Sequence, residues 1–295
     1  MGRIKELNVY TDKLKKTKKI LLVSDIHKEK KCGQENLDNL KEELIYDIDD
    51  VDFIVIPGDL INDTEDLKDP IFRRLFLDSL ESFTEGKPTI VSAGNHDKMT
   101  RIGTEKWNLG DKSLLPLALR ELDNVTFIRN QITHRVGNIC FGGFSPNCTY
   151  YLNKKESKEE YSKQFYSMFD KDKFSRETFN IFLTHEPQSI INLSKEKGEC
   201  IQPNTDLVVS GHMHNGLVPV FLHKLHGNKG WISPQMDLFP KYAQGEHTIG
   251  DTDFIINGAV NTRVETPLIN KIYGPNATII TINPSKEKQK VKRYY

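Results

Sequence analysis

The sequence predicts an α/β fold, a four-layer α-β-β-α sandwich with two packed mixed sheets, and three observations predict it. Short apolar runs rich in β-branched residues recur along the chain and end at Gly or turn residues, which is typical of strands buried on both faces. Stretches with helical spacing of apolar residues lie between them, so that strand and helix alternate. Further strand-like runs with many Gly and Pro follow in the last part of the chain, which predicts a second sheet against the first.

The elements follow one another in a regular order. A short opening strand is expected over residues 4–10. Five buried strands are expected over residues 20–23, 53–56, 89–93, 181–184 and 207–210. Helices are expected over residues 36–48, 71–83 and 158–169, and the later strands over residues 217–222, 253–256 and 277–282. Because no linker interrupts this order, we assign residues 1–295 to a single domain.

The composition excludes several classes of protein. Lys+Arg and Asp+Glu both number 41, and this balance argues against a nucleic-acid partner, which would need a basic excess. No apolar run approaches the ~20 residues of a transmembrane segment. The chain opens on charged residues without the apolar core of an export signal, and its cysteines, which form no C-x-x-C pair, are expected to be free thiols. We therefore expect the protein in the cytoplasm. The four cysteines are Cys32, Cys140, Cys148 and Cys200.

Polar motifs follow the five buried strands directly. Their side chains include two Asp, one Asn and four His, which are hard oxygen and imidazole donors suited to two adjacent divalent metal ions. Mn, Fe and Zn all accept such a mixture, and two carboxylates leave the pair of ions net positive, as a phosphate site requires. The sequence therefore predicts a two-metal hydrolase. The motifs are Ser24-Asp25-Ile26-His27, Gly58-Asp59, Gly94-Asn95-His96-Asp97, His185 and Gly211-His212-Met213-His214.

The spacing within two motifs predicts how their side chains converge. Asp25 and His27 stand two residues apart, which places both side chains on the same side of an extended segment, where they can reach one ion. His212 and His214 repeat this spacing, and each is expected to face a different ion. Asn95 offers a neutral amide oxygen, which is a donor seldom used unless a site already carries enough negative charge.

The order of these motifs resembles that of the calcineurin-like metallophosphoesterase family, whose pattern runs D-x-H, G-D, G-N-H-[D/E], H and G-H-x-H. That family has the same four-layer architecture. The resemblance implies that Asp59 bridges the two ions. It implies a first ion held by Asp25, His27, Asp59 and His214, and a second held by Asp59, Asn95, His185 and His212.

The same resemblance implies a catalytic role for His96. In the family this His stands outside the metal shell and faces the leaving-group oxygen, and an imidazole can protonate that oxygen as it departs. Asp97 is expected to orient the His96 ring. The mechanism implied is attack on phosphorus by a hydroxide that bridges the metals, without a covalent phosphoenzyme.

Other segments indicate the branch of the family. Serine/threonine protein phosphatases carry an Arg after the G-D motif, and residues 58–64 contain none, which disfavours that activity. Residues 239–245, 254–258 and 274–282 resemble bacterial phosphodiesterases of the YkuE and YaeI type. This favours a phosphodiesterase acting on a small or lipid-linked phosphoester, in the cytoplasm or at the membrane surface. A phosphomonoesterase, a nucleotide pyrophosphatase and a non-catalytic scaffold are the alternatives, and residues 224–251 are a substrate wall or pack on the second sheet.

Overall fold

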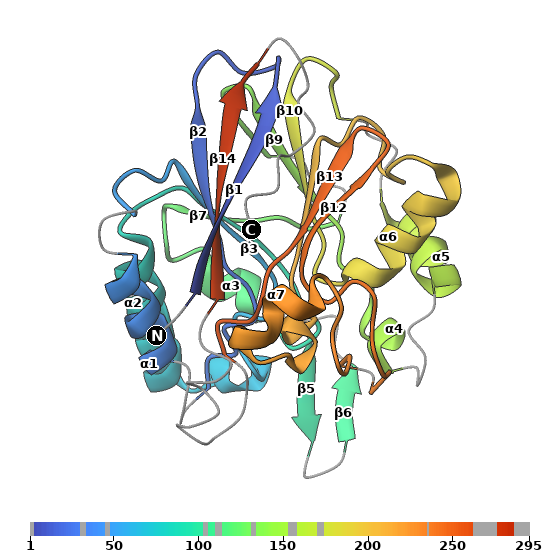
Figure 1. The fold of residues 1–295 in the computed structure, drawn as a ribbon. Helices are drawn as coiled ribbons and strands as arrows, with labels where there is room; N and C mark the ends of the chain where they lie inside the picture. Colours follow the sequence, from blue (N-terminus) through green and yellow to red (C-terminus); the bar gives the residue numbers. More distant parts are fainter. Residues whose placement is uncertain are drawn as a thin grey trace.

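A computed structural model gives the structure of the protein (Figure 1). Two six-stranded sheets pack face to face, and helices cover their outer surfaces. The arrangement confirms the expected four-layer α-β-β-α sandwich. The structure describes residues 3–29, 34–44, 48–102, 106–109, 114–130, 134–152, 158–169, 174–234, 236–261 and 276–285.

The first sheet contains the opening strand and the first three buried strands that the sequence predicts. Its order is β1-β14-β2-β3-β4-β7, and β2, β3, β4 and β7 are parallel, whereas β14 runs antiparallel to β2. The carboxyl ends of β2, β3 and β4 therefore lie at one edge. The strands are β1 (Arg3–Thr11), β2 (Lys18–Leu22), β3 (Phe53–Pro57), β4 (Thr89–Ser92), β7 (Val125–Phe127) and β14 (Asn276–Pro284).

The second sheet has the same plan. Its order is β12-β13-β11-β10-β9-β8, with β9, β10, β11 and β13 parallel and an antiparallel strand at each edge. The strands are β8 (His134–Val136), β9 (Ile139–Gly143), β10 (Phe179–Leu183), β11 (Leu207–Ser210), β12 (Gly245–Ile249) and β13 (Thr252–Ile256). A separate hairpin joins β5 (Met99–Ile102) to β6 (Lys106–Leu109).

Three apolar cores separate the four layers. Alternate residues of each central strand face opposite cores, as in β3, where Ile54 faces the helices and Val55 faces the other sheet. On the far side, Phe182 of β10 faces the outer helices. The helices on the first sheet are α1 (Gln34–Glu43), α2 (Pro70–Thr84) and α3 (Leu115–Leu119), and those on the second include α5 (Lys158–Met168) and α6 (Pro187–Lys197).

Helix α2 shows how the sequence determines where a helix begins and ends. The Asp69 carboxylate accepts hydrogen bonds from the backbone N–H of Ile71 and Phe72. Pro70 occupies the first turn, where a backbone N–H would have no partner within the helix. Glu85 ends the helix with a left-handed backbone. The buried face of α2 packs against the outer side of the first sheet.

Three expectations about the later chain were wrong in part. The second sheet does not consist of strands after His214, because β8 to β11 already belong to it. Residues 277–282 form β14 inside the first sheet, where Ile279 faces the helices and Ile280 faces the other sheet. Residues 217–222 do not form a strand: Leu217 ends the 3-10 helix η2 (His214–Leu217), and residues 220–222 form a second one, η3 (Val220–Leu222). The positive φ angle of Leu217 is incompatible with an extended strand.

Two smaller findings concern the composition. No helix among the described residues is long and apolar enough to cross a bilayer. Cys140 and Cys200 are free thiols, and the side chains of the other two cysteines lie outside the described part of the chain. Residues 274–275 of the tail that suggested a bacterial branch also lie outside the described residues.

Candidate metal centre

The polar motifs meet where the carboxyl ends of the two sheets face each other. The first three follow β2, β3 and β4 of one sheet, and the last two follow β10 and β11 of the other. Backbone hydrogen bonds hold neighbouring loops together: Asp25 N–H donates to Gly58 O at 3.2 Å, and His27 N–H donates to Asp59 O at 2.9 Å. Within the second sheet, Gly211 N–H donates to His185 O at 3.2 Å. Between the two sheets, His212 N–H donates to the Asp25 carboxylate, at 3.1 Å from Oδ1 and 3.0 Å from Oδ2. The motifs therefore sit on backbone that both sheets fix.

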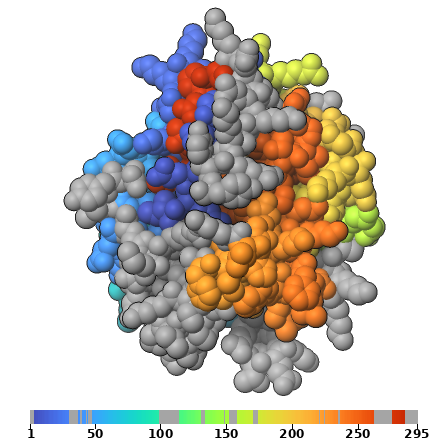
Figure 2. Space-filling model, in the orientation of Figure 1, coloured from blue at the N-terminus to red at the C-terminus, as the bar shows by residue number. Residues whose placement is uncertain are grey.

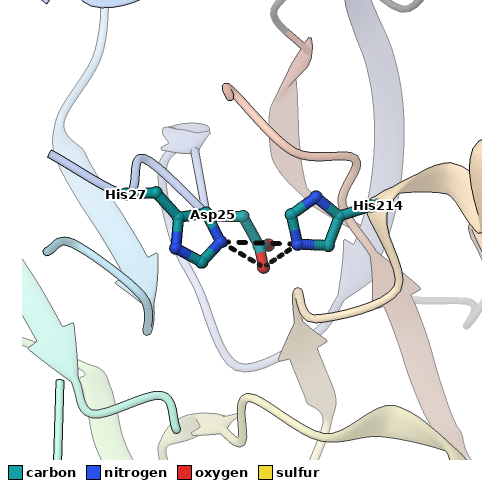
Figure 3. Close-up of side chains that lie close together, drawn as sticks. All are labelled: Asp25, His27 and His214. Carbon is teal, nitrogen blue, oxygen red and sulfur yellow. Dashed lines mark hydrogen bonds and ion pairs between the residues drawn. The ribbon is translucent and has the colours of Figure 1, made fainter. Parts of the chain in front are cut away.

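A first cluster consists of Asp25, His27 and His214 (Figure 3). The Nε2 atoms of His27 and His214 lie 3.4 Å apart, and Asp25 Oδ1 lies 3.4 Å from His214 Nε2 and 3.9 Å from His27 Nε2. Two imidazole nitrogens and a carboxylate oxygen thus converge on one point from two different sheets. These three atoms could together hold one divalent cation.

A second cluster consists of Asp59, His185 and His212. His185 Nε2 lies 3.1 Å from Asp59 Oδ2 and 3.2 Å from His212 Nδ1. The other nitrogen of His185, Nδ1, donates to the Pro57 carbonyl at 2.8 Å, which leaves the Nε2 lone pair directed into the cluster. All three residues are buried.

Asp59 lies between the two clusters. Its Oδ2 is 3.6 Å from His27 Nε2 and 3.1 Å from His185 Nε2, so one carboxylate reaches the imidazoles of both. Its other oxygen, Oδ1, accepts the backbone N–H of His96 at 2.8 Å. A carboxylate in this place can contact two neighbouring ions.

The backbone at these motifs differs from the extended conformation that we expected at Asp25 and His27. These two residues have φ angles of 55° and 48°, and Asp59, His212 and His214 also have positive φ. Their side chains still converge, because neighbouring loops fix the strained backbone. Left-handed backbone costs residues other than Gly about 1 kcal/mol or more each and collects at functional sites.

Two glycines allow the loops to approach this closely. A Cβ on Gly58, whose φ is 102°, would lie 2.5 Å from Gly94 N and 2.8 Å from His185 Nδ1. A Cβ on Gly211 would lie 2.5 Å from Asp25 Oδ2. The G-D and G-H-x-H motifs therefore need Gly for space, and Gly58 also needs it for its backbone conformation.

The electrostatics of the clusters favour a cation. Burial opposes ionisation of Asp59, but the imidazoles of His185, His96 and His27 outweigh it and hold the pKa of this carboxyl well below its usual value. Burial also disfavours a charged His185 ring, yet the carboxylates of Asp59 and Asp25 raise the pKa of His185 to about 10. The site thus binds a proton tightly at the lone pairs where a metal ion would bind.

Asp97 has a different environment from the one expected. Its carboxylate accepts the backbone N–H groups of Asp59, Leu60 and Gly94 at 2.7, 2.9 and 2.8 Å. Burial raises the pKa of Asp97 to about 7, and the Asp59 carboxylate adds to this increase. The hydrogen bonds tie the loops after β3 and β4 together, so Asp97 positions the loop that carries Asp59.

His96 has a backbone partner for its ring. Its Nδ1 donates to the carbonyl of Asn62 at 3.0 Å, which is the partner that we had expected Asp97 to provide. The ring lies edge-on to His27, with centroids 5.0 Å apart, and a nitrogen of His96 lies within 4.8 Å of the donor atoms of His27 and Asp59. The carbonyls of Asn62 and Pro57 could not be predicted from the sequence, because every residue has a backbone carbonyl and residue type does not show which one binds a side chain.

Asn95 supports the fit of a metal to this site. Its side chain is 7% exposed, and its Oδ1 has no hydrogen-bond partner among the described residues. A buried acceptor without a partner costs roughly 1–3 kcal/mol, and an ion that accepts oxygen ligands would remove this cost. The mixture of carboxylate, amide and imidazole donors suits Mn, Fe or Zn. The residues present therefore fit divalent metal ions.

The remaining histidines contribute to other parts of the fold. His223 and His226 lie on the short helix α7 (His223–His226), which follows the residues 217–222 that we expected to form a strand. His223 Nε2 donates to the Val218 carbonyl at 2.7 Å, and His226 Nε2 accepts from Trp231 Nε1 at 3.2 Å. Each ring thus has its own partner, so the pair does not form a chelate.

A four-layer sandwich with two linked donor clusters at the carboxyl ends of its strands defines a class of metal-dependent hydrolase folds. Comparison of the sequence with protein families identifies the class: the calcineurin-like phosphoesterase family matches residues 18–216. The chain belongs to this family. The matched region contains all five motifs and ends at Gly216, just after the last one.

Curated relatives are also metallophosphoesterases by name. An uncharacterized metallophosphoesterase of Helicobacter pylori is 28% identical over 218 residues, which cover 73% of this chain and 50% of the relative. One from Campylobacter jejuni is 26% identical over 239 residues, which cover 81% and 55%. The chain therefore spans about half the length of the curated relatives that it matches.

Two phosphatases are among the solved structures that are similar to this one. A dimetal phosphatase from Danio rerio is 11% identical, with a TM-score of 0.48 and coverage of 90% of this chain and 93% of that one. A purple acid phosphatase from yellow lupin is 12% identical, with a TM-score of 0.43 and coverage of 92% and 55%.

Proposed function

We propose that this chain is a metal-dependent hydrolase of phosphoester bonds, and that its preferred substrates are phosphodiesters. The observation that carries the proposal is the pair of donor clusters with Asp59 between them. Family membership supports the same reaction class. Asp25, His27, Asp59 and His214 are proposed to hold one divalent ion, and Asp59, Asn95, His185 and His212 the second.

When bound, two such ions supply a nucleophile at neutral pH from water and neutralise the phosphoryl oxygens. The chain's own residues do the rest. His96 keeps its ring in place through the Asn62 carbonyl and presents its other nitrogen toward the clusters, where it can donate a proton to the leaving-group oxygen. His185, held by the Pro57 carbonyl, keeps its lone pair directed inward. Asp97 fixes the backbone of Asp59.

The charge around the motifs supports a diester over a monoester. A phosphomonoester dianion is usually clamped by a guanidinium or ammonium group, and residues 58–64 supply no Arg or Lys. Lys98, directly after the third motif, donates through Nζ to the carbonyls of Ser145 and Pro146 at 2.8 and 3.1 Å. Lys28 lines a cavity beside α2. Phosphomonoesters and nucleotide pyrophosphates remain the alternative substrates.

A non-catalytic scaffold with the same fold is the alternative from another class. Intact donor clusters and His96 support catalysis over this reading. We further propose that residues 1–295 form one catalytic domain, supported by the pairing of β14 with both β1 and β2. The proposed location is the cytoplasm or the membrane surface, and a small or lipid-linked phosphoester is the proposed substrate class.

Turnover of two chromogenic substrates tests the proposal. Metal-free protein is supplied with Mn²⁺ and given bis-p-nitrophenyl phosphate or p-nitrophenyl phosphate in parallel. We expect hydrolysis of the diester with the higher kcat/KM, and none after chelation. Faster hydrolysis of the monoester would assign a phosphomonoesterase. No turnover with Mn²⁺, Fe²⁺ or Zn²⁺ at full metal occupancy would favour the scaffold.

A further inference from the structure

Strongly exposed apolar side chains collect in one segment of the chain. Five large ones fall within residues 221–239, with exposed fractions between 67% and 82%. Single exposed apolar residues are common on soluble proteins, but a group of large ones marks an interaction site. The five, which we call the apolar patch, are Phe221, Leu225, Met236, Leu238 and Phe239.

Hydrogen bonds connect the two parts of the apolar patch. Phe221 and Leu225 lie on η3 and α7, and the other three lie on a turn that follows Trp231. Trp231 joins the two parts: its Nε1 donates to His226 Nε2 at 3.2 Å, and its carbonyl accepts the N–H of Phe239 at 2.9 Å. The patch is therefore held together by a defined structure.

The backbone of the turn holds its side chains outward. Ser233 N–H donates to the Asp237 carbonyl, and Met236 N–H donates to the Ser233 carbonyl, each at 2.9 Å. Met236 and Phe239 have φ angles of 68° and 56°, in the left-handed region that such residues rarely adopt. Side chains exposed this far protrude from the surface and do not line a groove.

The patch lies close to the candidate metal centre along the chain. Its segment, residues 221–239, begins shortly after His214. The Gly216 carbonyl accepts the N–H groups of Trp231 and Ile232 at 2.7 and 3.1 Å. In Figure 2 this part of the chain, gold to orange, forms a continuous surface in the lower middle of the visible face. A surface that binds to this patch is therefore brought toward the loops of the metal centre.

The charge of the segment differs from that of the whole chain. Residues 217–244 contain three Lys, one Asp, and no Arg or Glu, whereas the chain as a whole is neutral. Lys229 and Lys241 are exposed. Protruding Phe, Leu and Met side chains beside lysines are typical of protein surfaces that insert into an anionic bilayer, where the lysines reach the headgroups.

We propose that the apolar patch docks the protein on the surface of an anionic phospholipid membrane. Protruding side chains favour a fluid lipid surface over a second copy of the chain, which would need a complementary groove. The proposal goes beyond the reaction and does not depend on it, because docking needs neither metal nor substrate. If both hold, the metal centre lies near the phosphoesters of lipid headgroups.

Sedimentation with vesicles tests the docking. Vesicles of phosphatidylglycerol and phosphatidylcholine in equal parts are expected to bind the full chain, and vesicles of phosphatidylcholine alone to bind it much less. A Leu225→Ser/Phe239→Ser variant should lose roughly tenfold in partition coefficient per side chain, because each loses its apolar burial. The control variant Ile71→Ser/Leu117→Ser removes two exposed apolar side chains elsewhere and should bind normally.

A second pair of variants tests the charge. Lys229→Gln/Lys241→Gln should weaken binding roughly fivefold per lysine and reduce its dependence on salt. Lys15→Gln/Lys16→Gln is the matched control, since these exposed lysines lie before β2, at the opposite end of the sheet from the motifs. Circular dichroism melting and metal content show whether each variant folds.

Three results would overturn the proposal. The first is no binding of the full chain to anionic vesicles, and the second is an equal loss in the control variants. The third is a dimer by sedimentation velocity that Leu225→Ser/Phe239→Ser dissociates, with no vesicle binding, which would assign the patch to a second copy. Binding that persists without any hydrolytic activity would contradict the proposed function and leave the docking intact.

Discussion

At the scale of single residues, His96 is the proposed proton donor to the leaving group. Its Nδ1 donates to the Asn62 carbonyl at 3.0 Å, and this bond orients the ring. We expect His96→Ala to keep both metals and to lose roughly 10²- to 10⁴-fold in turnover of alkyl phosphodiesters, the usual worth of such proton transfer. The loss should be smaller for p-nitrophenyl esters, which need little protonation.

A matched control and metal content make the result for His96 interpretable. Asn62→Ala keeps the backbone carbonyl that holds the ring, so its turnover should stay near normal. Equal losses on alkyl and p-nitrophenyl esters would show that His96 stabilises phosphoryl charge instead. Loss of metal in His96→Ala would make it a ligand, which its distance of at most 4.8 Å from the donors of His27 and Asp59 allows.

Asp59 is the carboxylate that we propose to bridge the two ions. An amide at this position would remove charge from both ions and would bridge them poorly. Asp59→Asn should therefore lower metal content and turnover together, measured by elemental analysis and by hydrolysis of the diester. Asp206→Asn, which alters a buried aspartate at the far end of β11, should keep full metal content. Normal occupancy and turnover in Asp59→Asn would show that it is not the bridge.

At the scale of elements, the loops after the strands determine whether the clusters form. Gly211 precedes His212, and a Cβ there would lie 2.5 Å from Asp25 Oδ2 and 2.7 Å from Ser24 Oγ. Gly211→Ala should displace the Asp25 carboxylate and lower diester turnover roughly 10²-fold, as displacements of about 1 Å do. Gly137→Ala has open space around its Cβ but a φ of 59°, so it should lower stability by about 1 kcal/mol and leave the turnover of the folded protein unchanged. Equal turnover in both variants would show that the site does not need Gly211 for space.

The elements that could be predicted are those whose pattern is local. Buried strands such as β3 and helices such as α2 were located from apolar runs and from the helical spacing of apolar residues. Residues 277–282 were recognised as a strand, but not their place between β1 and β2, because pairing over more than 250 residues leaves no local pattern. Edge strand β8, with two partly buried residues and one exposed residue, was missed for lack of an apolar run.

The candidate site was easier to predict than the sheets. Its residue types, including Asn95 and His185, identify donor chemistry directly, and parallel strands bring their carboxyl ends together. The positive φ angles of Asp25 and His27 could not be predicted, since they depend on hydrogen bonds to the loop after β3. The partner of the His96 ring is a backbone carbonyl, which could likewise not be predicted from the residue types.

At the scale of the whole molecule, the metal centre joins the two sheets. Each cluster takes donors from both sheets: Asp25 and His27 meet His214, and Asp59 meets His185 and His212. The order of the two sheets places β2, β3 and β4 opposite β10 and β11, with an apolar core between them. The four-layer architecture is therefore what makes two adjacent ions possible.

The number of metal ions per chain is the most direct test of the proposed two-metal site. Protein purified without chelator is analysed for Mn, Fe and Zn, together with His27→Ala/His214→Ala and His185→Ala/His212→Ala, which each remove imidazoles of one cluster. If each cluster holds one ion, we expect about two ions per chain in the unaltered protein and about one in each variant. A single ion per chain whose occupancy neither variant changes would contradict the two-metal site.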